Sequence, residues 1–379
     1  MKSNLSPIAA VRSDVGPMAV VFNVSATDVE ESEDEPPSLV ADAEVVEVAG
    51  HVVEALQRAG VDARPVALGG PVSPALDGLM AQGVKRIFNL MEGVEGDAGR
   101  EHEFAAAVGA RRMACTGSPA TALFLAGRKQ EARAALLAAG LPVAEGFVVT
   151  TISDLPRLPG SAFPVFVKPT MADGSIGIDQ GSVIADQPAL IKRVRWLLER
   201  LGQPCLVEAW LPGTEVNVVI LPPGLTARAA ATVIDFSALP PGLHPVVTYD
   251  AKWRPASPEY VSRSVPAARV IGGVQLREAL RLGLAAFAAI GGRGYGRVDM
   301  RGDRDGRFRV IDINPNPDLH PEAGFAAGAA SVGVPWAQLI RAIAASARVW
   351  RTREYSSDSG HRSATTGRPA RTDRGLHTN

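Results

Sequence analysis

Strand-like and helix-like segments alternate over the first 118 residues, and this order most restricts the possible folds. The run MAVVFNV at 18–24 is short, apolar and rich in β-branched residues, which is typical of a buried strand. Helical periodicity follows at 43–60, and two more strand-like runs stand at 61–68 and 84–90. The strand–helix–strand order predicts a parallel α/β domain, which we place at residues 15–118.

The rest of the chain has a different pattern, in which strand-like runs stand next to one another. The predicted elements are a helix at 127–143, strands at 163–170 and 181–186, a helix at 188–202, strands within 205–221, a Pro-rich connection at 235–262, a helix at 275–291, a hairpin at 296–314 and a helix at 335–350. The Asp305-Gly306 pair is a good signal for the turn of that hairpin. We expect a central unit at 119–204, a C-terminal unit at 205–350 and a disordered tail at 351–379.

The composition favours small-molecule partners. Lys and Arg total 39 against 40 Asp and Glu, which gives a net charge of -1 and no general attraction to nucleic acid or anionic lipid. No run of about 18 apolar residues predicts a membrane span, and the first residues lack the pattern of a secretory leader. The sequence therefore predicts a soluble, cytoplasmic protein without nucleic-acid or membrane partners.

Two segments carry little chemistry. The acidic stretch TDVEESEDEPPS at 27–38, which overlaps an acidic loop placed at 28–42, predicts a mobile loop because it offers almost nothing to bury. Cys115 and Cys205 stand far apart and outside any CxxC pattern, so no disulfide framework or zinc site can be inferred. We expect both cysteines to be small buried apolar residues.

The strand RVIDIN at 309–314 ends in an acid, an amide and two prolines rather than in a Gly/Ser turn. Asp312 and Asn314 are two residues apart and therefore project from one face of the strand. Asp299 precedes the hairpin turn by a similar span and would come within roughly 5 to 8 Å of them across the ladder. Two carboxylates and an amide oxygen form a hard ligand set that suits Mg²⁺. The alternative is a solvated turn, which the pattern alone favours.

The stretch KPTMADGSIGI at 168–178 is the candidate phosphate holder. Lys168 leaves a strand, and Gly174, Ser175 and Gly177 form a flexible turn whose free N–H groups can bind an anion. A P-loop motif does not occur, and GGRGYG follows a helix and precedes a strand, which is the wrong order for a dinucleotide-binding fingerprint. An ordinary hairpin loop with a surface lysine is an equally weighted alternative.

The stretch LVEAWLPGTEVNVV places Glu208 and Glu215 on either side of a hinge-like AWLPG connector. Such an arrangement suits a nucleotide, because the connector's peptide groups can meet the adenine edge while the carboxylates meet an amino group and the ribose hydroxyls. The spacing alone does not identify ATP.

Taken together, successive stretches resemble the ATP-grasp ligases of the D-alanine:D-alanine ligase type. The stretches, in matching order, are IFNLMEGVEGDAG, CTGSPATALFLAGRKQEARAALLAAGLPV, FPVFVKPTMADGSIGI, LVEAWLPGTEVNVVIL, YDAKW and GYGRVDMRGDRDGRFRVIDINPNP. The resemblance covers residues 84 to 345. It implies an α/β fold with α+β character in the C-terminal part: an N-terminal parallel α/β pre-ATP-grasp domain followed by a two-subdomain ATP-grasp fold.

The resemblance also implies a role for each matching residue. The residues that it implies for binding ATP are Lys129, Lys168, Gly174, Ser175, Gly177, Glu208, Ala209, Leu211, Glu215 and Lys252. The metal ligands that it implies, for Mg²⁺ with Mn²⁺ as the alternative, are Asp299, Asp312 and Asn314. Relatives often carry Glu at the middle position, so the shorter Asp312 would reach fewer metal positions. Arg297 and Lys252 are the implied catalytic residues, and Arg297 would steady the acyl phosphate and its tetrahedral adduct.

The implied reaction joins a carboxylate to an amine. ATP would phosphorylate the carboxylate, and the amine would then displace phosphate to give a peptide or amide, ADP and phosphate. Departures from the family's pattern predict an acceptor other than D-alanine: GEDG becomes GDAG, and Ala323 stands where the family holds the acceptor's carboxylate with a serine. His320 and Glu322 are candidates for contact with another acceptor, although a capped, solvated loop is the favoured alternative. Arg100, Glu101 and His102 present the same choice, with ordinary helix-start residues favoured.

Three alternative functions stay open at this point. The chain could be a genuine D-alanine:D-alanine ligase, a small-molecule kinase on the same fold, or a nucleotide-binding protein without turnover. The sequence does not identify the carboxylate and amine substrates, which are expected to be amino acids or similar molecules. It also leaves open whether two chains pair as a homodimer.

Overall fold

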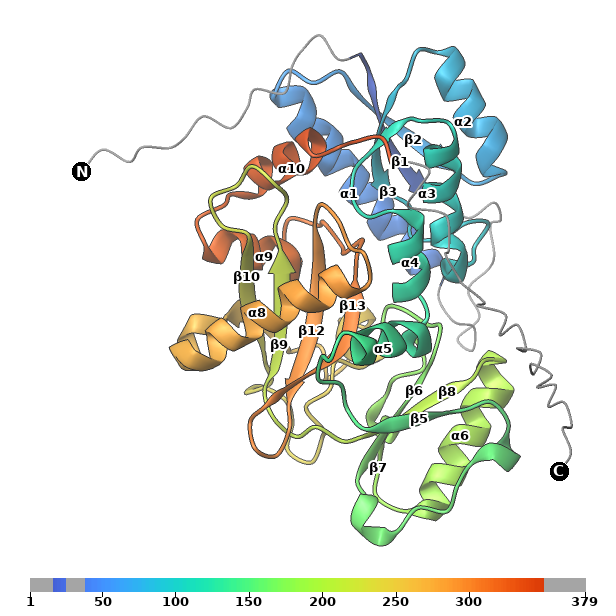
Figure 1. Cartoon of the computed structure of the whole chain (residues 1–379), viewed down its shortest axis with the longest axis vertical. Helices are drawn as coiled ribbons and strands as arrows, with labels where there is room; N and C mark the ends of the chain where they lie inside the picture. The colour runs from blue at the N-terminus through green and yellow to red at the C-terminus, as the bar shows by residue number, and fades with distance from the viewer. Residues whose placement is uncertain (1–15, 25–37, 351–379) are drawn as a thin grey trace, which may run out of the picture.

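The structure is a computed structural model that describes residues 16–24 and 38–350 (Figure 1). Within this part of the chain, three β-sheets form from successive stretches of sequence, and helices cover their faces. The loop predicted for the acidic region is outside the described residues as far as residue 37. The tail predicted at 351–379 is outside them as well.

The first sheet is parallel, with strand order β2-β1-β3-β4. Its elements are β1 (Met18–Asn23), α1 (Ser38–Arg58), β2 (Ala63–Leu68), α2 (Val72–Ala81), β3 (Arg86–Leu90), α3 (Glu101–Ala110) and β4 (Ala114–Cys115). Alternate residues of β1 face opposite sides, so Met18 and Val20 pack with α1 while Ala19 and Val21 pack with α2 and α3. The predicted parallel α/β domain is confirmed.

Helix α1 begins earlier than predicted. It starts at Ser38 instead of residue 43 and ends at Arg58 instead of residue 60. Residues 38–42 of the expected acidic loop are therefore helical. Leu39 and Ala41 are strong helix formers, and the two prolines that precede Ser38 are tolerated just before a helix. The helix start was predicted too late because the acidic residues before Ser38 favoured a loop in this region.

The second sheet is antiparallel, with strand order β5-β8-β6-β7. Its elements, with the two helices before them, are α4 (Ala120–Ala126), α5 (Lys129–Ala138), β5 (Gly146–Val149), β6 (Val165–Pro169), β7 (Val183–Ile184), α6 (Gln187–Leu201) and β8 (Cys205–Ala209). Helix α6 covers one face, where Leu190, Val194 and Leu197 follow the helical repeat and pack on the strands. Asp186 caps its first turn and Gly202 ends it in the left-handed conformation.

Strand β8 corrects one expected boundary. It pairs with both β5 and β6, so the second sheet continues beyond residue 204 and the chain passes to the next sheet within 210–214. The apolar run at 205–209 was expected to open the C-terminal unit because its pairing partners cannot be inferred from the run itself. The domain boundaries otherwise stay a prediction.

The third sheet is antiparallel, with strand order β11-β10-β9-β12-β13. Its elements, with the helices around it, are β9 (Glu215–Ile220), β10 (Ala229–Asp235), α7 (Tyr249–Trp253), β11 (Arg263–Pro266), α8 (Gly273–Ala289), β12 (Gly296–Gly302), β13 (Phe308–Asn314), α9 (Gly324–Ser331) and α10 (Trp336–Ala345). Helices α8 and α9 cover opposite faces (Figure 1). The β12–β13 hairpin is confirmed, whereas β10 and β11 were not predicted.

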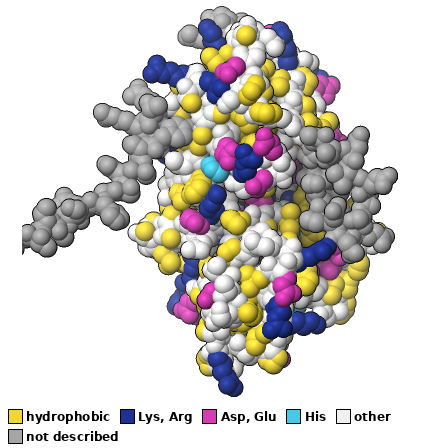
Figure 2. All heavy atoms as spheres, turned by 90° about the vertical axis from the view of Figure 1, so that its right-hand side faces the viewer, with side chains coloured by type: hydrophobic (Ala, Val, Ile, Leu, Met, Phe, Trp, Pro, Cys, Tyr) yellow, Lys and Arg dark blue, Asp and Glu magenta, His cyan; other side chains and the backbone are white. Residues whose placement is uncertain are grey.

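The end of the described chain returns to the first sheet. Helix α10 packs against α1, and Arg348 forms a β-bridge with Cys115. Cys115 and Cys205 are both buried with free thiols, as expected. Among the helices of the described residues, none is both long and apolar enough to cross a membrane. Figure 2 shows a face on which basic, acidic and apolar side chains are mixed, without a large patch of one charge.

Candidate active site

A cavity of about 1000 Å³ opens where the second and third sheets meet, and the first sheet's loops close one side of it. Of the residues predicted for ATP, metal or catalysis, those that line this cavity are Lys129, Lys168, Gly174, Ser175, Glu208, Ala209, Leu211, Glu215, Lys252, Arg297, Asp299, Asp312 and Asn314. The structure therefore brings together nearly the whole predicted set from sequence positions 129 to 314.

Gly177 is the exception, since it does not line the cavity. Its φ is 73°, and a Cβ there would stand 2.9 Å from Leu201 Cδ1, in the packing against α6. Glycine at this position is required by backbone conformation and close packing. A phosphate-binding role for Gly177 stays a prediction, and its place outside the cavity lining does not support that role.

Lys168 connects the two antiparallel sheets at the cavity floor. It projects from β6, and its Nζ donates to the Ile311 carbonyl oxygen at 2.9 Å and to Glu208 Oε2 at 3.0 Å. Lys168 and Glu208 are buried, so removing either charge would leave the other poorly solvated. Arg133 forms a second ion pair with Glu208, at 3.3 Å.

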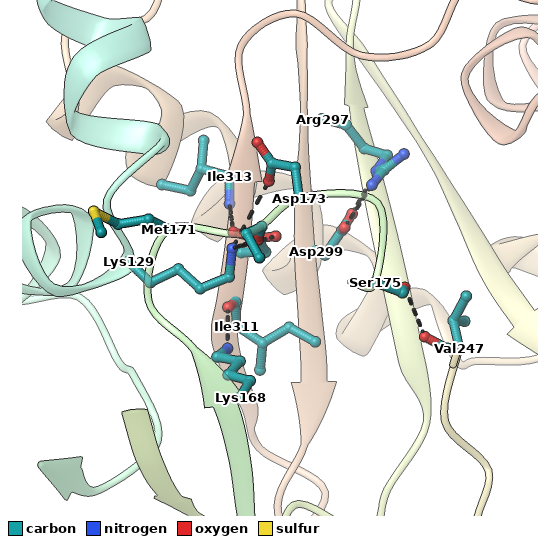
Figure 3. Close-up of polar contacts among 12 residues, drawn as sticks. Lys129, Lys168, Met171, Asp173, Ser175, Val247, Arg297, Asp299, Ile311 and Ile313 are labelled. Carbon is teal, nitrogen blue, oxygen red and sulfur yellow. Dashed lines mark hydrogen bonds and ion pairs between the residues drawn. The ribbon is translucent and has the colours of Figure 1, made fainter. Parts of the chain in front are cut away.

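Lys129 stands beside this pair at the start of α5. Its Nζ donates to the Ala172 carbonyl oxygen at 2.9 Å and is 3.8 Å from both Asp312 Oδ2 and Asp173 Oδ1 (Figure 3). Burial alone would lower the pKa of the Lys129 ammonium, but the nearby carboxylates of Asp312, Asp173, Glu208 and Asp299 together outweigh it and raise that pKa. Lys129 thus holds a positive charge next to the predicted metal ligands.

The hairpin arranges the predicted metal ligands as neighbours. Asp299 on β12 stands opposite Asp312 on β13, and Arg297 stands opposite Asn314. Arg297 Nε and Nη2 donate to the two carboxylate oxygens of Asp299 at 2.7 and 2.8 Å (Figure 3). The pairing register shifts next to Asp299, which leaves Ile311 as an extra residue whose carbonyl accepts from Lys168.

Two residues that the sequence reasoning missed complete this face of the sheet. Asn217 Nδ2 donates to Asp299 Oδ1 at 2.7 Å, and Arg301 forms an ion pair with Glu215 at 2.9 Å. Five residues on alternate positions of two paired strands line the cavity: Glu215 and Asn217 on β9, and Arg297, Asp299 and Arg301 on β12. The alternation of polar residues along EVNVV and GRVDMR was the signal that would have identified both missed residues.

The turn between β6 and β7 is tied to the Pro-rich connection. Trp253 Nε1 donates to the Gly174 carbonyl oxygen at 2.7 Å. Ser175 Oγ donates to the Val247 carbonyl oxygen at 2.8 Å, as Figure 3 shows. Ser175 has a φ of 63°, so the turn adopts a conformation that non-glycine residues seldom take. Lys252 in α7 packs over the Trp253 ring, 4.5 Å from its centroid, and lines the same cavity.

The loop after β13 carries His320 and Glu322, the two candidates for contact with the acceptor, and only one of them lines the cavity. Glu322 lines the cavity, whereas His320 does not. Asp318 Oδ1 accepts from the His320 backbone N–H at 2.7 Å, as expected for a capped loop. Ala323 is the N-cap residue of α9 and has no hydroxyl to offer.

Glu101, the first residue of α3, has a second role beyond starting that helix. It lines the cavity, and its Oε1 accepts from Asn316 Nδ2 at 2.9 Å. Burial, the nearby Asp173 and Glu92 together raise the pKa of the Glu101 carboxyl well above its usual range. The adjacent Arg100 turns away and binds Glu103 and Glu95.

Glu101→Gln is expected to stabilise the free protein at pH 8 and to have little effect near pH 4. The folded state holds the Glu101 proton more tightly than the unfolded state, so this group's contribution is lost as pH rises through its raised pKa. A neutral glutamine removes that loss, and the thermal midpoint at pH 8 should rise by about 1–3 °C.

Thermal denaturation of both proteins across this pH range measures the difference. Glu103→Gln is the matched control, because Arg100 lowers the pKa of Glu103 and its replacement should not stabilise the protein. Equal midpoints for Glu101→Gln and the unchanged protein at pH 8 would contradict the assigned environment.

The part of the chain that builds most of this cavity matches a known protein family. The family model described as "D-ala D-ala ligase C-terminus" matches residues 139–345, more than half of the chain. The chain belongs to the D-alanine–D-alanine ligase family. The predicted family and the enzyme class, an ATP-dependent ligase that forms a carbon–nitrogen bond, are thereby confirmed.

Curated relatives in this family have moderate identity to the chain. The D-alanine–D-alanine ligase of Actinobacillus succinogenes is 27% identical over 77% of this chain and 89% of that protein. The D-alanine–D-alanine ligase of Gluconobacter oxydans is 29% identical over 76% of this chain and 88% of that protein.

Solved structures show the same fold at lower identity. The D-alanine–D-alanine ligase from Bacillus anthracis complexed with ATP has a TM-score of 0.64 at 16% identity, covering 87% of this chain and 96% of that chain. The VanG D-Ala:D-Ser ligase from Enterococcus faecalis has a TM-score of 0.61 at 16% identity, covering 86% and 98%. The predicted α/β ATP-grasp fold is confirmed.

Proposed function

We propose that this ligase activates a carboxylate as an acyl phosphate and then joins it to an amine other than D-alanine. The observation that carries the proposal is the meeting of Lys129 and Lys168 with Asp299, Asp312 and Asn314 in one cavity. ATP and a carboxylate would bring about five negative charges into that cavity, and one ion pair at 4 Å contributes about 4 kcal/mol at an effective dielectric near 20. Several cations are therefore needed, and the cavity supplies them.

Each group has a distinct task in this mechanism. Lys129, Lys168 and Lys252 hold the phosphates of ATP so that the carboxylate oxygen faces the γ-phosphorus in line with the departing ADP. The attacking carboxylate oxygen bonds to that phosphorus as the bond to the ADP oxygen breaks. The amine then adds to the acyl carbon, and Arg297 stabilises the oxyanion until phosphate leaves and the amine proton is released.

The hairpin's oxygen ligands fit a magnesium ion. Asp299 and Asp312 stand opposite each other, Asn314 adds an amide oxygen, and no histidine or cysteine takes part. Mg²⁺ held there would neutralise charge on the β- and γ-phosphates, and Mn²⁺ suits the same ligands. Asp299 keeps its bonds to Arg297 and Asn217, so its orientation is fixed before a nucleotide binds.

Support for a different amine comes from the side of the cavity that faces the first sheet. Glu44, Glu92, Glu101 and Asp318 line it, and none of the four has an ion-pair partner within 4 Å among the described residues. Loss of hydration to the surrounding protein, helped by Asp318 and Glu44, raises the pKa of Glu92 to about 7. These carboxylates suit an amino group better than a second carboxylate, and D-alanine as acceptor carries one.

A genuine D-alanine–D-alanine ligase is the second candidate, because the curated relatives carry that name. A kinase of this fold and a nucleotide-binding protein without turnover are the remaining alternatives. A cytoplasmic location and pairing as a homodimer stay predictions.

An ADP-release screen over D- and L-amino acids, amines and small carboxylates tests the proposal. We expect ADP release to require both a carboxylate and an amine, to be slight with D-alanine alone, and to stop when EDTA removes the divalent cation. Mass spectrometry should find the condensed product.

Each alternative predicts a different result in the same screen. Rapid turnover with D-alanine alone would establish the second candidate. A stable phosphorylated product without an amine requirement would establish a kinase, and MgATP binding without ADP release across the whole panel would establish a protein without turnover.

A further inference from the structure

A cluster of two histidines and one glutamate stands outside the cavity and has no task in the proposed reaction. Glu47 and His51 lie one turn apart on α1, and His320 belongs to the loop after β13. Glu47 Oε1 is 3.5 Å from His51 Nε2 and 3.7 Å from His320 Nε2. One ligand atom from each of the three residues lies within 4.8 Å of the others. We call these three residues the Glu47 cluster.

The spacing is close to that of a metal centre. Donor atoms bound tetrahedrally at 2.0–2.2 Å from one ion are about 3.3–3.6 Å apart, so small side-chain rotations would bring the three atoms to bonding distance. Two imidazoles and one carboxylate are typical ligands for Zn²⁺ and for related ions such as Co²⁺, whereas Mg²⁺ prefers oxygen ligands. The Glu47 cluster therefore differs in chemistry from the oxygen set on the hairpin.

The surroundings orient the two imidazole rings. The His51 ring meets the His320 and Trp336 rings edge to face, with centroids 5.7 and 6.3 Å apart. Trp336 is held in turn by donation from its Nε1 to the Leu319 carbonyl oxygen at 2.9 Å. His51 and His320 are both half-buried, while Glu47 is exposed, so an ion could enter from solvent on the Glu47 side.

Metal binding has one identifiable cost. The Glu322 backbone N–H donates to His320 Nδ1 at 3.2 Å, which favours the tautomer with its proton on Nε2. An ion on Nε2 needs that proton to move to Nδ1, and the hydrogen bond from Glu322 would be lost. The loss of one such bond should weaken Zn²⁺ binding by about 10-fold at most, and three protein ligands can offset a penalty of that size.

We propose that Glu47, His51 and His320 bind a borderline divalent transition-metal ion, with Zn²⁺ as the best-suited ion. The ion would join α1 of the first sheet to the loop that follows Asn314 and carries Glu322 into the cavity. Its binding does not depend on the ligase reaction. The test therefore needs no substrate and stays valid whatever the ADP-release screen shows.

Calorimetric titration of the full chain with Zn²⁺, in excess Mg²⁺ to occupy the oxygen ligands, is the direct test. We expect one ion per chain with a Kd below about 10 µM, weakened at least about 10-fold in His51→Ala and in His320→Ala. Glu47→Gln should weaken binding while keeping the side-chain shape. Substituting Co²⁺ should give visible absorption bands of a four- or five-coordinate site that disappear in His51→Ala.

His102→Ala is the matched control, because His102 contacts Phe124 and belongs to α3, on the opposite face of the first sheet from α1. It should bind Zn²⁺ like the unchanged protein, and it retains His361 and His377, which lie outside the described residues. Equal Zn²⁺ binding by all variants, or none by the unchanged protein in excess Mg²⁺, would overturn the proposal. Thermal midpoints in EDTA show whether each variant is folded. If a histidine variant is not folded, the Zn²⁺ affinity of Glu47→Gln decides between the two outcomes.

Discussion

Arg297→Ala is expected to lower the rate of substrate-dependent ADP release by about 100- to 1,000-fold, the usual loss when one oxyanion donor is removed. The affinity for MgATP should change little. In the proposed mechanism Arg297 contributes its charge beside the reacting centre, whereas Lys129 and Lys168 hold the phosphates. Asp299 keeps the hydrogen bond from Asn217, so this carboxylate of the proposed metal site stays in place without the guanidinium.

Steady-state kinetics of ADP release and calorimetric titration with ATP separate these two effects. Arg309→Ala is the matched control, because Arg309 is on the neighbouring strand, binds Asp303 at 2.9 Å and does not line the cavity. Turnover by Arg297→Ala at the rate of the control would remove Arg297 from the mechanism. A parallel loss of ATP affinity would instead place Arg297 among the nucleotide-binding residues.

Lys168→Met is expected to have the largest combined effect on stability and on ATP binding. Among the described residues, it leaves Arg133 as the only ion-pair partner of the buried Glu208. It also removes the Lys168 donor from the Ile311 carbonyl oxygen. Breaking a buried pair in this way typically costs roughly 3–5 kcal/mol of unfolding free energy. The ATP Kd should rise at least about 100-fold, since one phosphate contact near 4 Å contributes about 4 kcal/mol.

The double variant Lys168→Met with Glu208→Gln distinguishes the two effects. Removing both charges should restore much of the unfolding free energy in urea titrations, because no buried carboxylate is left poorly paired and Arg133 keeps its hydrogen bond to the Ala144 carbonyl oxygen. ATP binding should stay weak. Lys192→Met, on the exposed side of α6, is the control and should change neither quantity. If Lys168→Met binds ATP as well as the control does, Lys168 serves only the packing of the two sheets.

The hairpin was the part of the site most open to prediction. Strand alternation and the Asp-Gly turn place Asp299 near Asp312, and the structure pairs these two residues directly. The position of the lysines was harder to predict, because no local pattern indicates that Lys129 and Lys168, which belong to different elements, line the same cavity. Lys168 was a candidate from its glycine-rich turn, whereas Lys129 was assigned only through the resemblance to a family. The roles of both remain predictions.

Other features depend on long-range pairing that a single sequence does not reveal. Strands β10 and β11 flank a Pro-rich connection. Their short sequences do not by themselves indicate strands, and they are strands because they pair within the third sheet. Gly177 was expected at a phosphate because glycine-rich turns often bind anions, whereas its neighbours are the apolar side chains of α6. From the sequence, Glu101 was expected to be an ordinary helix-start residue. Its contact with Asn316 could not be predicted, because the two residues are 215 positions apart.

The extra residue at Ile311 has a consequence for how this hairpin tolerates change in length. A deletion or insertion within β13 would transfer Asp312 and Asn314 to the side of the sheet covered by α8 and would also withdraw the carbonyl that Lys168 uses. The turn at residues 303–307 neither orients Asp312 and Asn314 nor supplies the carbonyl oxygen that binds Lys168. Sequences that diverge from this one should therefore vary in the number of turn residues while the spacing from Val310 to Asn314 stays constant.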